Sequence, residues 1–238
     1  MHRRTAPRLA RILACAAVPV MLVATGCSSD SGGSKKESAK PSQSATPAAS
    51  PTPKAGTYAK LPDVCKTISD KTVDKMVPKA EKKEGKALPT ADTNDSASCF
   101  WSGLNDEDVK DLQFRTLTIS LKRLDPAPNL GQSADKRAQD FAAKQTTTAT
   151  TADGAKDAKT EQASGIGDGA SVVSTSTKKD DNDYKNVIVV ARTANVVITV
   201  KYQGAGFEGA KTPNPDDMKK DAQDAAKEVV AAVAKANK

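Results

Sequence analysis

Histidine is almost absent from this chain of 238 residues, because its one histidine is His2. A mature chain that has lost its first residues on export would contain none. That composition excludes Ser-His and Cys-His nucleophilic catalysis, histidine-ligated metal sites and imidazole pH switches. Aromatic residues are also few: the chain has eight, all beyond residue 57. So small a number predicts a modest hydrophobic core.

Acidic residues are absent from the first 26 positions, which carry four arginines. Basic residues outnumber acidic ones by 36 to 29 in the whole chain, so the part after position 26 is close to neutral, with 32 basic residues. The sequence shows no basic face rich in arginine and aromatic residues. We therefore predict no nucleic-acid partner.

The N-terminus has the pattern of a lipoprotein signal peptide. Residues 1–11 are basic, and residues 12–24 form an apolar run that is too short to span a bilayer comfortably. The run ends in Leu22-Val23-Ala24-Thr25-Gly26-Cys27, which resembles a lipobox. This pattern predicts removal of residues 1–26 and a diacylglyceryl lipid on Cys27. An uncleaved anchor or a buried helix is the alternative, and the export route, general secretory or twin-arginine, stays open.

A lipid on Cys27 would hold the protein on the outer face of the cytoplasmic membrane. Residues 28–56 contain no aromatic and no large aliphatic residue. Such a segment cannot bury enough apolar surface to offset its ordering entropy, so residues 27–57 are predicted to be a lipidated, disordered tether rich in Ser, Thr and Pro. Residues 58–238 are predicted to form a single globular domain.

The cysteines beyond Cys27 are Cys65 and Cys99. In an exported protein, two remaining cysteines predict one structural disulfide. A zinc or redox pair is the alternative, but the two cysteines are far apart, form no C-x-x-C motif and have no third ligand type nearby.

Periodicity predicts an α+β fold: an antiparallel sheet of about five strands with three helices packed mainly on one side, and one disulfide. The expected helices cover 70–77, 134–145 and the chain from 215 onward, and the expected strands cover 98–102, 116–124, 170–176, 186–192 and 196–202. Residues 78–97 are predicted to be a loop, and residues 146–151 to be extended or a loop.

Capping residues mark the first and last helices. Ser69 is placed to cap the helix that begins at Asp70, and Asn214 with Pro215 marks the start of the final helix. Apolar residues recur in the final helix at steps of three and four, which favours packing on the sheet over the alternative of lying on a membrane.

Four short motifs invite functional interpretations. The segment 204–209 matches the G-x-G-x-x-G pattern of a phosphate-binding turn, but no helix opens within it, so we predict no cofactor there. The segment 165–169, Gly-Ile-Gly-Asp-Gly, predicts a tight turn in which Asp168 caps backbone amides. The acidic clusters 105–108 and 180–183 lack the spacing of a calcium loop and predict polar turns. No metal site follows from them.

Several of these features together resemble the actinobacterial lipoproteins grouped as domain of unknown function 3558. They are Leu-Pro-Asp-Val-Cys ahead of a short helix, Cys-Phe-Trp at 99–101, the turn beginning at Gly165 and an alanine-rich final helix. The family more often has Asp-Pro-Cys where this chain has Asp63-Val64-Cys65. The resemblance implies an envelope location and an α+β domain with one disulfide. It implies no activity and no catalytic residue.

The sequence therefore favours a non-enzymatic binding module that recognises a protein, glycan or lipid of the cell envelope, with no cofactor. The alternative is a regulatory or assembly partner of a membrane sensor or transporter. A hydrolase that uses carboxylates is a third hypothesis, although no carboxylate pair is marked out by local sequence. Trp101 is predicted to be a core residue beside the disulfide, with an aromatic wall of a ligand groove as the alternative.

The lipid anchor can be tested by replacing its attachment site. We expect Cys27→Ala to shift the protein from the membrane fraction to the soluble fraction, because the variant has no sulfur to carry the predicted lipid. Fractionation and immunoblotting would measure the shift, with Cys15→Ala as the matched control. Retention of Cys27→Ala in the membrane fraction would contradict the lipobox.

Overall fold

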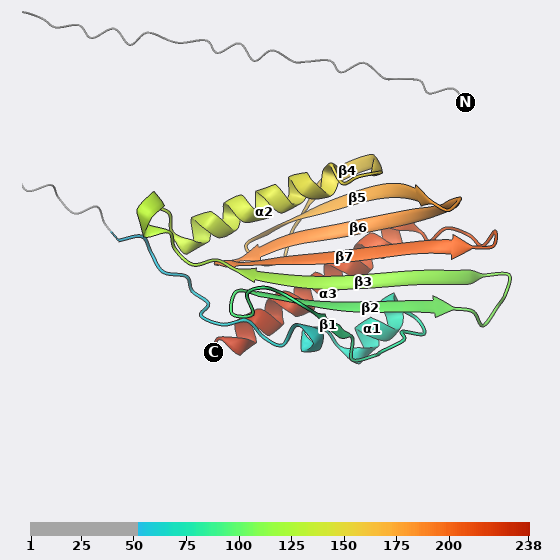
Figure 1. Cartoon of the computed structure of the whole chain (residues 1–238), viewed down its shortest axis with the longest axis horizontal. Helices are drawn as coiled ribbons and strands as arrows, with labels where there is room; N and C mark the ends of the chain where they lie inside the picture. The colour runs from blue at the N-terminus through green and yellow to red at the C-terminus, as the bar shows by residue number, and fades with distance from the viewer. Residues whose placement is uncertain (1–51) are drawn as a thin grey trace, which may run out of the picture. The chain divides into compact units, whose positions relative to one another are not determined.

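The structure, a computed structural model, describes residues 52–238, so the predicted signal peptide, Cys27 and most of the tether lie outside the described residues. Within this range the chain forms a seven-stranded antiparallel sheet with the strand order β1-β2-β3-β7-β6-β5-β4 (Figure 1). The strands are β1 (Lys86–Leu88), β2 (Ser96–Asn105), β3 (Leu112–Arg123), β4 (Lys156–Ala163), β5 (Gly169–Lys179), β6 (Asn182–Thr193) and β7 (Val196–Phe207). The helices are α1 (Asp70–Met76), α2 (Ala134–Thr150) and α3 (Pro215–Ala236).

The predicted α+β class is confirmed, but the prediction of about five strands is wrong. The two additional strands, β1 and β4, lie at the two edges of the sheet. All residues of β4 except the last are exposed, and β1 is exposed at two of its three positions. An edge strand held by pairing to one neighbour does not need an apolar face, so alternation in the sequence does not reveal it. For the same reason, the prediction that residues 78–97 form a loop is wrong at β1.

The helices lie on both faces of the sheet, α1 and α3 on one and α2 on the other, so the prediction that they pack mainly on one side missed the second layer. Val187 and Val189 of β6 join the larger core beneath α3, which crosses behind the strands in Figure 1. Ile188 and Val190 belong to a smaller cluster on the opposite face, together with Ala138 of α2. An uninterrupted apolar run is typical of a strand that is buried on both faces. The apolar run 187–190 therefore indicates, from the sequence alone, a strand that is covered on both faces.

α1 and α3 begin at the predicted capping residues. The Ser69 hydroxyl accepts a hydrogen bond from the Thr72 amide at 3.2 Å. The Asn214 side chain accepts from the amides of Asp216 and Asp217. Six residues of the predicted apolar stripe of α3 are buried: Met218, Ala222, Ala225, Ala226, Val229 and Val233. Packing of α3 on the sheet is thus confirmed.

α2 extends to Thr150, beyond the predicted end at residue 145. Threonine is a poor helix former because its branched side chain loses freedom in a helix. Here the Thr146 hydroxyl donates to the Ala142 carbonyl at 3.1 Å, and the Thr147 hydroxyl donates to the Ala143 carbonyl at 3.2 Å. Ala149 in this last part is buried. Packing on the sheet therefore overrides the local preference of the threonine run.

The predicted disulfide is confirmed, since Cys65 and Cys99 are bonded. It joins the 3-10 turn Val64–Lys66 to β2. Trp101 lies close to it and is 1% exposed, which confirms its prediction as a core residue. The Trp101 indole N–H donates to the Lys83 carbonyl at 3.0 Å. A Cβ atom at Gly85, where φ is +73°, would lie 2.6 Å from both the Cys99 Sγ and the Trp101 ring. These contacts fix the segment before β1 against the sheet.

Asn195 fixes the point at which the chain enters the domain. It is fully buried in the turn between β6 and β7. Its side-chain oxygen accepts from the Tyr58 amide at 2.8 Å, and its amide nitrogen donates to the carbonyls of Tyr58 and Leu124, both at 3.0 Å. The start of the domain is thereby held at the β6–β7 turn, at one end of the sheet.

The disulfide should contribute substantially to stability. By the loop-entropy estimate, a bond across a separation of 34 residues contributes about 3–4 kcal/mol. We expect Cys65→Ser to lower the melting temperature by about 10 °C in a domain of this size, as measured by circular dichroism. Ser171→Ala, on β5, is the control and should melt within about 2 °C of the unchanged protein. An unchanged melt for Cys65→Ser would contradict a stabilising disulfide.

Removing the Asn195 contacts should lower the free energy of unfolding more than removing a similar set of contacts at the surface. Asn195→Ala leaves backbone groups of Tyr58 and Leu124 without partners inside the domain, which should cost about 3 kcal/mol. Asn237 makes matching bonds to Ala59 and Lys60 at exposed positions, where water can replace them. We therefore expect Asn237→Ala to cost about 1 kcal/mol or less. Urea unfolding would measure both, and equal losses would contradict the role assigned to burial.

Candidate functional site

The face of the sheet that carries α2 is only partly covered. α2 packs on β4, β5, β6 and part of β7, whereas β2 and β3 lie away from α2 in Figure 1. We call the uncovered part the open face. It consists of alternate residues of three adjacent strands: Ser98, Phe100 and Ser102 of β2, Thr116, Thr118 and Ser120 of β3, and Lys201 and Gln203 of β7.

The strand register places these side chains in rows across the sheet. Phe100 lies opposite Thr118, and Thr118 lies opposite Lys201. The next row contains Ser102, Thr116, Gln203 and Asn186. Directly opposite residues of antiparallel strands point to the same face. The pairing alone therefore gathers hydroxyl and amide groups from distant parts of the sequence.

Three hollows adjoin one another along β7, and we call them together the groove. Their volumes are about 200, 320 and 250 Å³. The first and second share Lys201, and the second and third share Thr177 and Gln203. The hydroxyl and amide residues along them are Ser96, Ser98, Ser120, Gln145, Thr116, Thr118, Thr177, Asn186 and Gln203, together with the buried Thr175 and Thr199. The groove thus offers many uncharged hydrogen-bonding groups in a continuous surface.

Hydrogen bonds between neighbouring strands orient part of this surface. The Gln203 amide nitrogen donates to the Asn186 side-chain oxygen at 2.7 Å, and the Asn186 amide nitrogen donates to the Thr177 hydroxyl at 3.3 Å. The Ser98 hydroxyl donates to the Ser120 hydroxyl at 2.8 Å. Side chains held in this way lose less conformational freedom when a ligand binds.

An aromatic cluster lies at the end of the groove that is remote from Asn195. The rings of Phe114 and Phe207 are stacked, with centroids 5.5 Å apart and planes inclined by 17°. The Tyr184 ring packs edge-on against both, at 6.4 and 6.1 Å. All three residues are half-buried. Flat apolar surface thus remains accessible next to Gln203 and Lys179, which line the same hollow.

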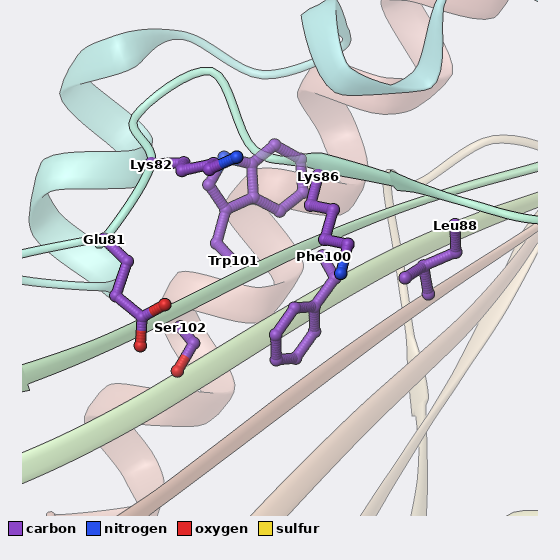
Figure 2. A pocket seen from close by; sticks show the side chains of 7 residues that line it. All are labelled: Glu81, Lys82, Lys86, Leu88, Phe100, Trp101 and Ser102. Atoms are coloured by element: carbon purple, nitrogen blue, oxygen red, sulfur yellow. The ribbon is translucent and has the colours of Figure 1, made fainter.

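A separate hollow of about 500 Å³, the edge pocket, lies where β2 meets the segment 81–88. Figure 2 shows its lining residues: Glu81, Lys82, Lys86, Leu88, Phe100, Trp101 and Ser102. The side chains of Phe100 and Trp101 point to opposite sides of β2, and Lys86 extends toward Phe100 (Figure 2). Since Phe100 and Ser102 also belong to the open face, the edge pocket extends that face to the edge of the sheet.

Acid–base groups are scarce in the groove. Among the described residues that line it, the titratable side chains are three lysines and two tyrosines, with no carboxylate. The Tyr202 hydroxyl donates to the Met76 carbonyl at 2.7 Å, on the α1 side of the sheet. Burial raises the pKa of this phenol to about 12. The described lining of the groove is therefore suited to hydrogen bonding and to holding anions.

The short motifs singled out in the sequence lie in one strand and in turns of the domain. Residues 204–207 of the G-x-G-x-x-G match are paired strand residues of β7, in keeping with the prediction of no phosphate turn there. The Asp168 carboxylate accepts from the Ala194 amide at 2.6 Å and lies 3.0 Å from the Arg192 guanidinium. Asp168 therefore caps one backbone amide, which belongs to the β6–β7 turn and not to its own turn. The acidic clusters 105–108 and 180–183 lie at the β2–β3 and β5–β6 turns, where Asn105 ends β2 and Asn182 and Asp183 begin β6.

Comparison with known proteins gives little to assign a function. No protein-family model matches the chain, and no curated protein matches it. Among solved structures, the chain is similar to LpqN of Mycobacterium tuberculosis, a protein involved in cell envelope biogenesis. The two share 15% sequence identity over 62% of this chain and 82% of that one, with a TM-score of 0.25. A likeness at that TM-score carries no argument. None of the helices between residues 52 and 238 has the length and apolar character needed to cross a membrane.

The groove was not predicted from the sequence. Thr116, Thr118 and Ser120 alternate with the apolar residues Leu117, Ile119 and Leu121, a pattern that indicates only a strand with one solvent-facing side. The polar alternation in 199–203 was the other available signal. Polar alternation marks any strand with one wet face, so it cannot distinguish a binding surface from an ordinary solvated one.

Proposed function

We propose that this chain is a lipid-anchored protein of the cell envelope, on the outer face of the cytoplasmic membrane, and that its domain binds a glycan without transforming it. The groove carries the proposal, because it combines a row of hydroxyl and amide side chains with an aromatic cluster at one end. The Cys27 lipid and the tether would keep this groove close to the membrane. Membership of the lipoprotein family grouped as domain of unknown function 3558 is part of the same proposal.

Glycan chemistry matches the groove. Sugars present many hydroxyl groups that both donate and accept hydrogen bonds, and Asn, Gln, Ser and Thr side chains can do the same. Sugars also have apolar C–H faces, which can pack on accessible aromatic rings such as those of Phe114 and Tyr184. Gln203 contributes to both the central hollow and the aromatic one. A chain of sugar residues could therefore contact both in succession.

Binding without turnover is favoured by the lining residues. Glycoside hydrolysis usually needs an acid and a second carboxylate on opposite sides of the scissile bond. The described residues of the edge pocket include one carboxylate, Glu81, and those of the groove include none. These lining residues support recognition, and the hydrolase hypothesis has no residue pair there to carry it.

Retention of the full-length chain, solubilised in detergent, on gels that contain envelope polysaccharide from the source organism would test the proposal. We expect Gln203→Ala to weaken retention about fivefold, on the order of one lost hydrogen bond. The control, Gln223→Ala, changes the same side chain on α3, on the opposite face of the sheet, and should bind like the unchanged protein.

Two results would contradict the proposal: no retention by any polysaccharide fraction, or equal retention of Gln203→Ala and the unchanged chain when both melt at the same temperature. The alternative is a regulatory or assembly partner of a membrane sensor or transporter. A crosslink from the open face to one membrane protein, without polysaccharide binding, would favour that alternative.

A further inference from the structure

Lysines are distributed along the whole groove. Lys122 and Lys201 line the first hollow, Lys201 also lines the central one, and Lys179 lines the hollow with the aromatic rings. The edge pocket adds Lys82 and Lys86 next to a single carboxylate. The chain as a whole has 36 basic and 29 acidic residues. The described lining of the groove and edge pocket, with five lysines and one carboxylate, is therefore far more positive than the average of the chain.

The groove lysines are available to a ligand. No ion pair within residues 52–238 includes Lys122, Lys179 or Lys201, each of which is half-buried or exposed. Lysines on α3 differ: Lys219 lies 3.1 Å from Glu161, and Lys227 lies 3.1 Å from Asp224. A ligand anion in the groove would thus not have to displace a carboxylate of the domain.

The spacing of the lysines indicates an extended ligand. Lys201 of β7 lies opposite Thr118 of β3, and Lys122 is four residues after Thr118 on β3. Standard strand dimensions separate the Cα atoms of Lys122 and Lys201 by roughly 14 Å. Lys86 lies in the same row as Lys201, three strands away, which again gives roughly 14 Å. A chain of sugars can span this spacing and contact several of these charges at once.

We propose that the groove binds an extended anionic polysaccharide, with Lys122, Lys201 and Lys179 each facing an anionic group of the chain. This inference rests on the proposed function, since it specifies the class of glycan. Lysine carries a compact point charge whose ammonium group can donate to either a carboxylate or a phosphodiester. The hydroxyl and amide groups between the lysines favour a polysaccharide over a lipid surface, because they match sugar hydroxyls along the chain.

Polygalacturonate and its fully methyl-esterified form make a matched pair of probes, since they differ in charge but share one sugar backbone. We expect the full-length chain in detergent to bind polygalacturonate at least tenfold more tightly than the ester, by affinity electrophoresis. Lys201→Gln should weaken polygalacturonate binding about three- to fivefold, in line with a solvent-accessible charge pair. Raising the salt concentration should weaken binding by the unchanged chain more than by Lys201→Gln.

Lys71→Gln is the matched control. Lys71 is an exposed lysine of α1, a helix that packs against α3 on the opposite face of the sheet, and its replacement should leave binding unchanged. An equal effect of Lys71→Gln would mean that net charge alone drives binding, and would overturn the inference.

The outcomes separate this inference from the proposed function. Equal affinity for the acid and the ester, with binding still reduced by Gln203→Ala, would overturn the anionic preference and leave glycan binding intact. Failure to bind either probe or any envelope polysaccharide would overturn both. Binding to phosphatidylglycerol vesicles that depends on Lys201, without binding to polygalacturonate, would assign the anion to a lipid surface and also overturn the inference.

Discussion

The register of β7 is the constraint on which the rest of the domain depends. β7 pairs with β3 on one side and with β6 on the other. In this register Ile198 and Val200 join the core under α3, while Thr199, Lys201 and Gln203 point to the opposite face. Side chains alternate along a strand, so a slip of one residue would exchange the two sets. The same pairing therefore makes the core and the candidate binding surface.

The two faces of the sheet differ because the helices that cover them differ. α3 presents a buried stripe with three valine-sized or larger residues among alanines, and it covers the apolar side of β5, β6 and β7. α2 has a weaker apolar surface, in which Ala138, Phe141 and Ala142 contact the sheet. A helix with so little apolar surface can cover only part of a sheet. The polar positions of β2 and β3 stay accessible for this reason, and the groove forms along the boundary of α2.

The few aromatic residues include four whose positions bear on the candidate site. Trp101 is enclosed beside the disulfide and fixes the segment that forms one side of the edge pocket. Phe114, Tyr184 and Phe207 instead gather at the far end of the groove and remain half-buried. Burial of these rings would have enlarged a modest core. Their position on the polar face is the feature that most favours a ligand there.

The sequence by itself determined the features that depend on neighbouring residues, namely the starts of α1 and α3 after Ser69 and Asn214 and the strands β6 and β7. The pairing of Cys65 with Cys99 followed from the number of cysteines beyond Cys27. Caps, turns and alternating burial act over a few residues, so they can be recognised in one dimension. Only the tertiary structure decided that β1 and β4 pair at the edges, that α2 covers the second face, and that Lys122 and Lys201 share a groove. Edge strands take their conformation from a partner strand, and the groove assembles side chains that are about 80 residues apart. No local sequence pattern shows that residues so far apart lie together, because the pairing register of the sheet brings them together.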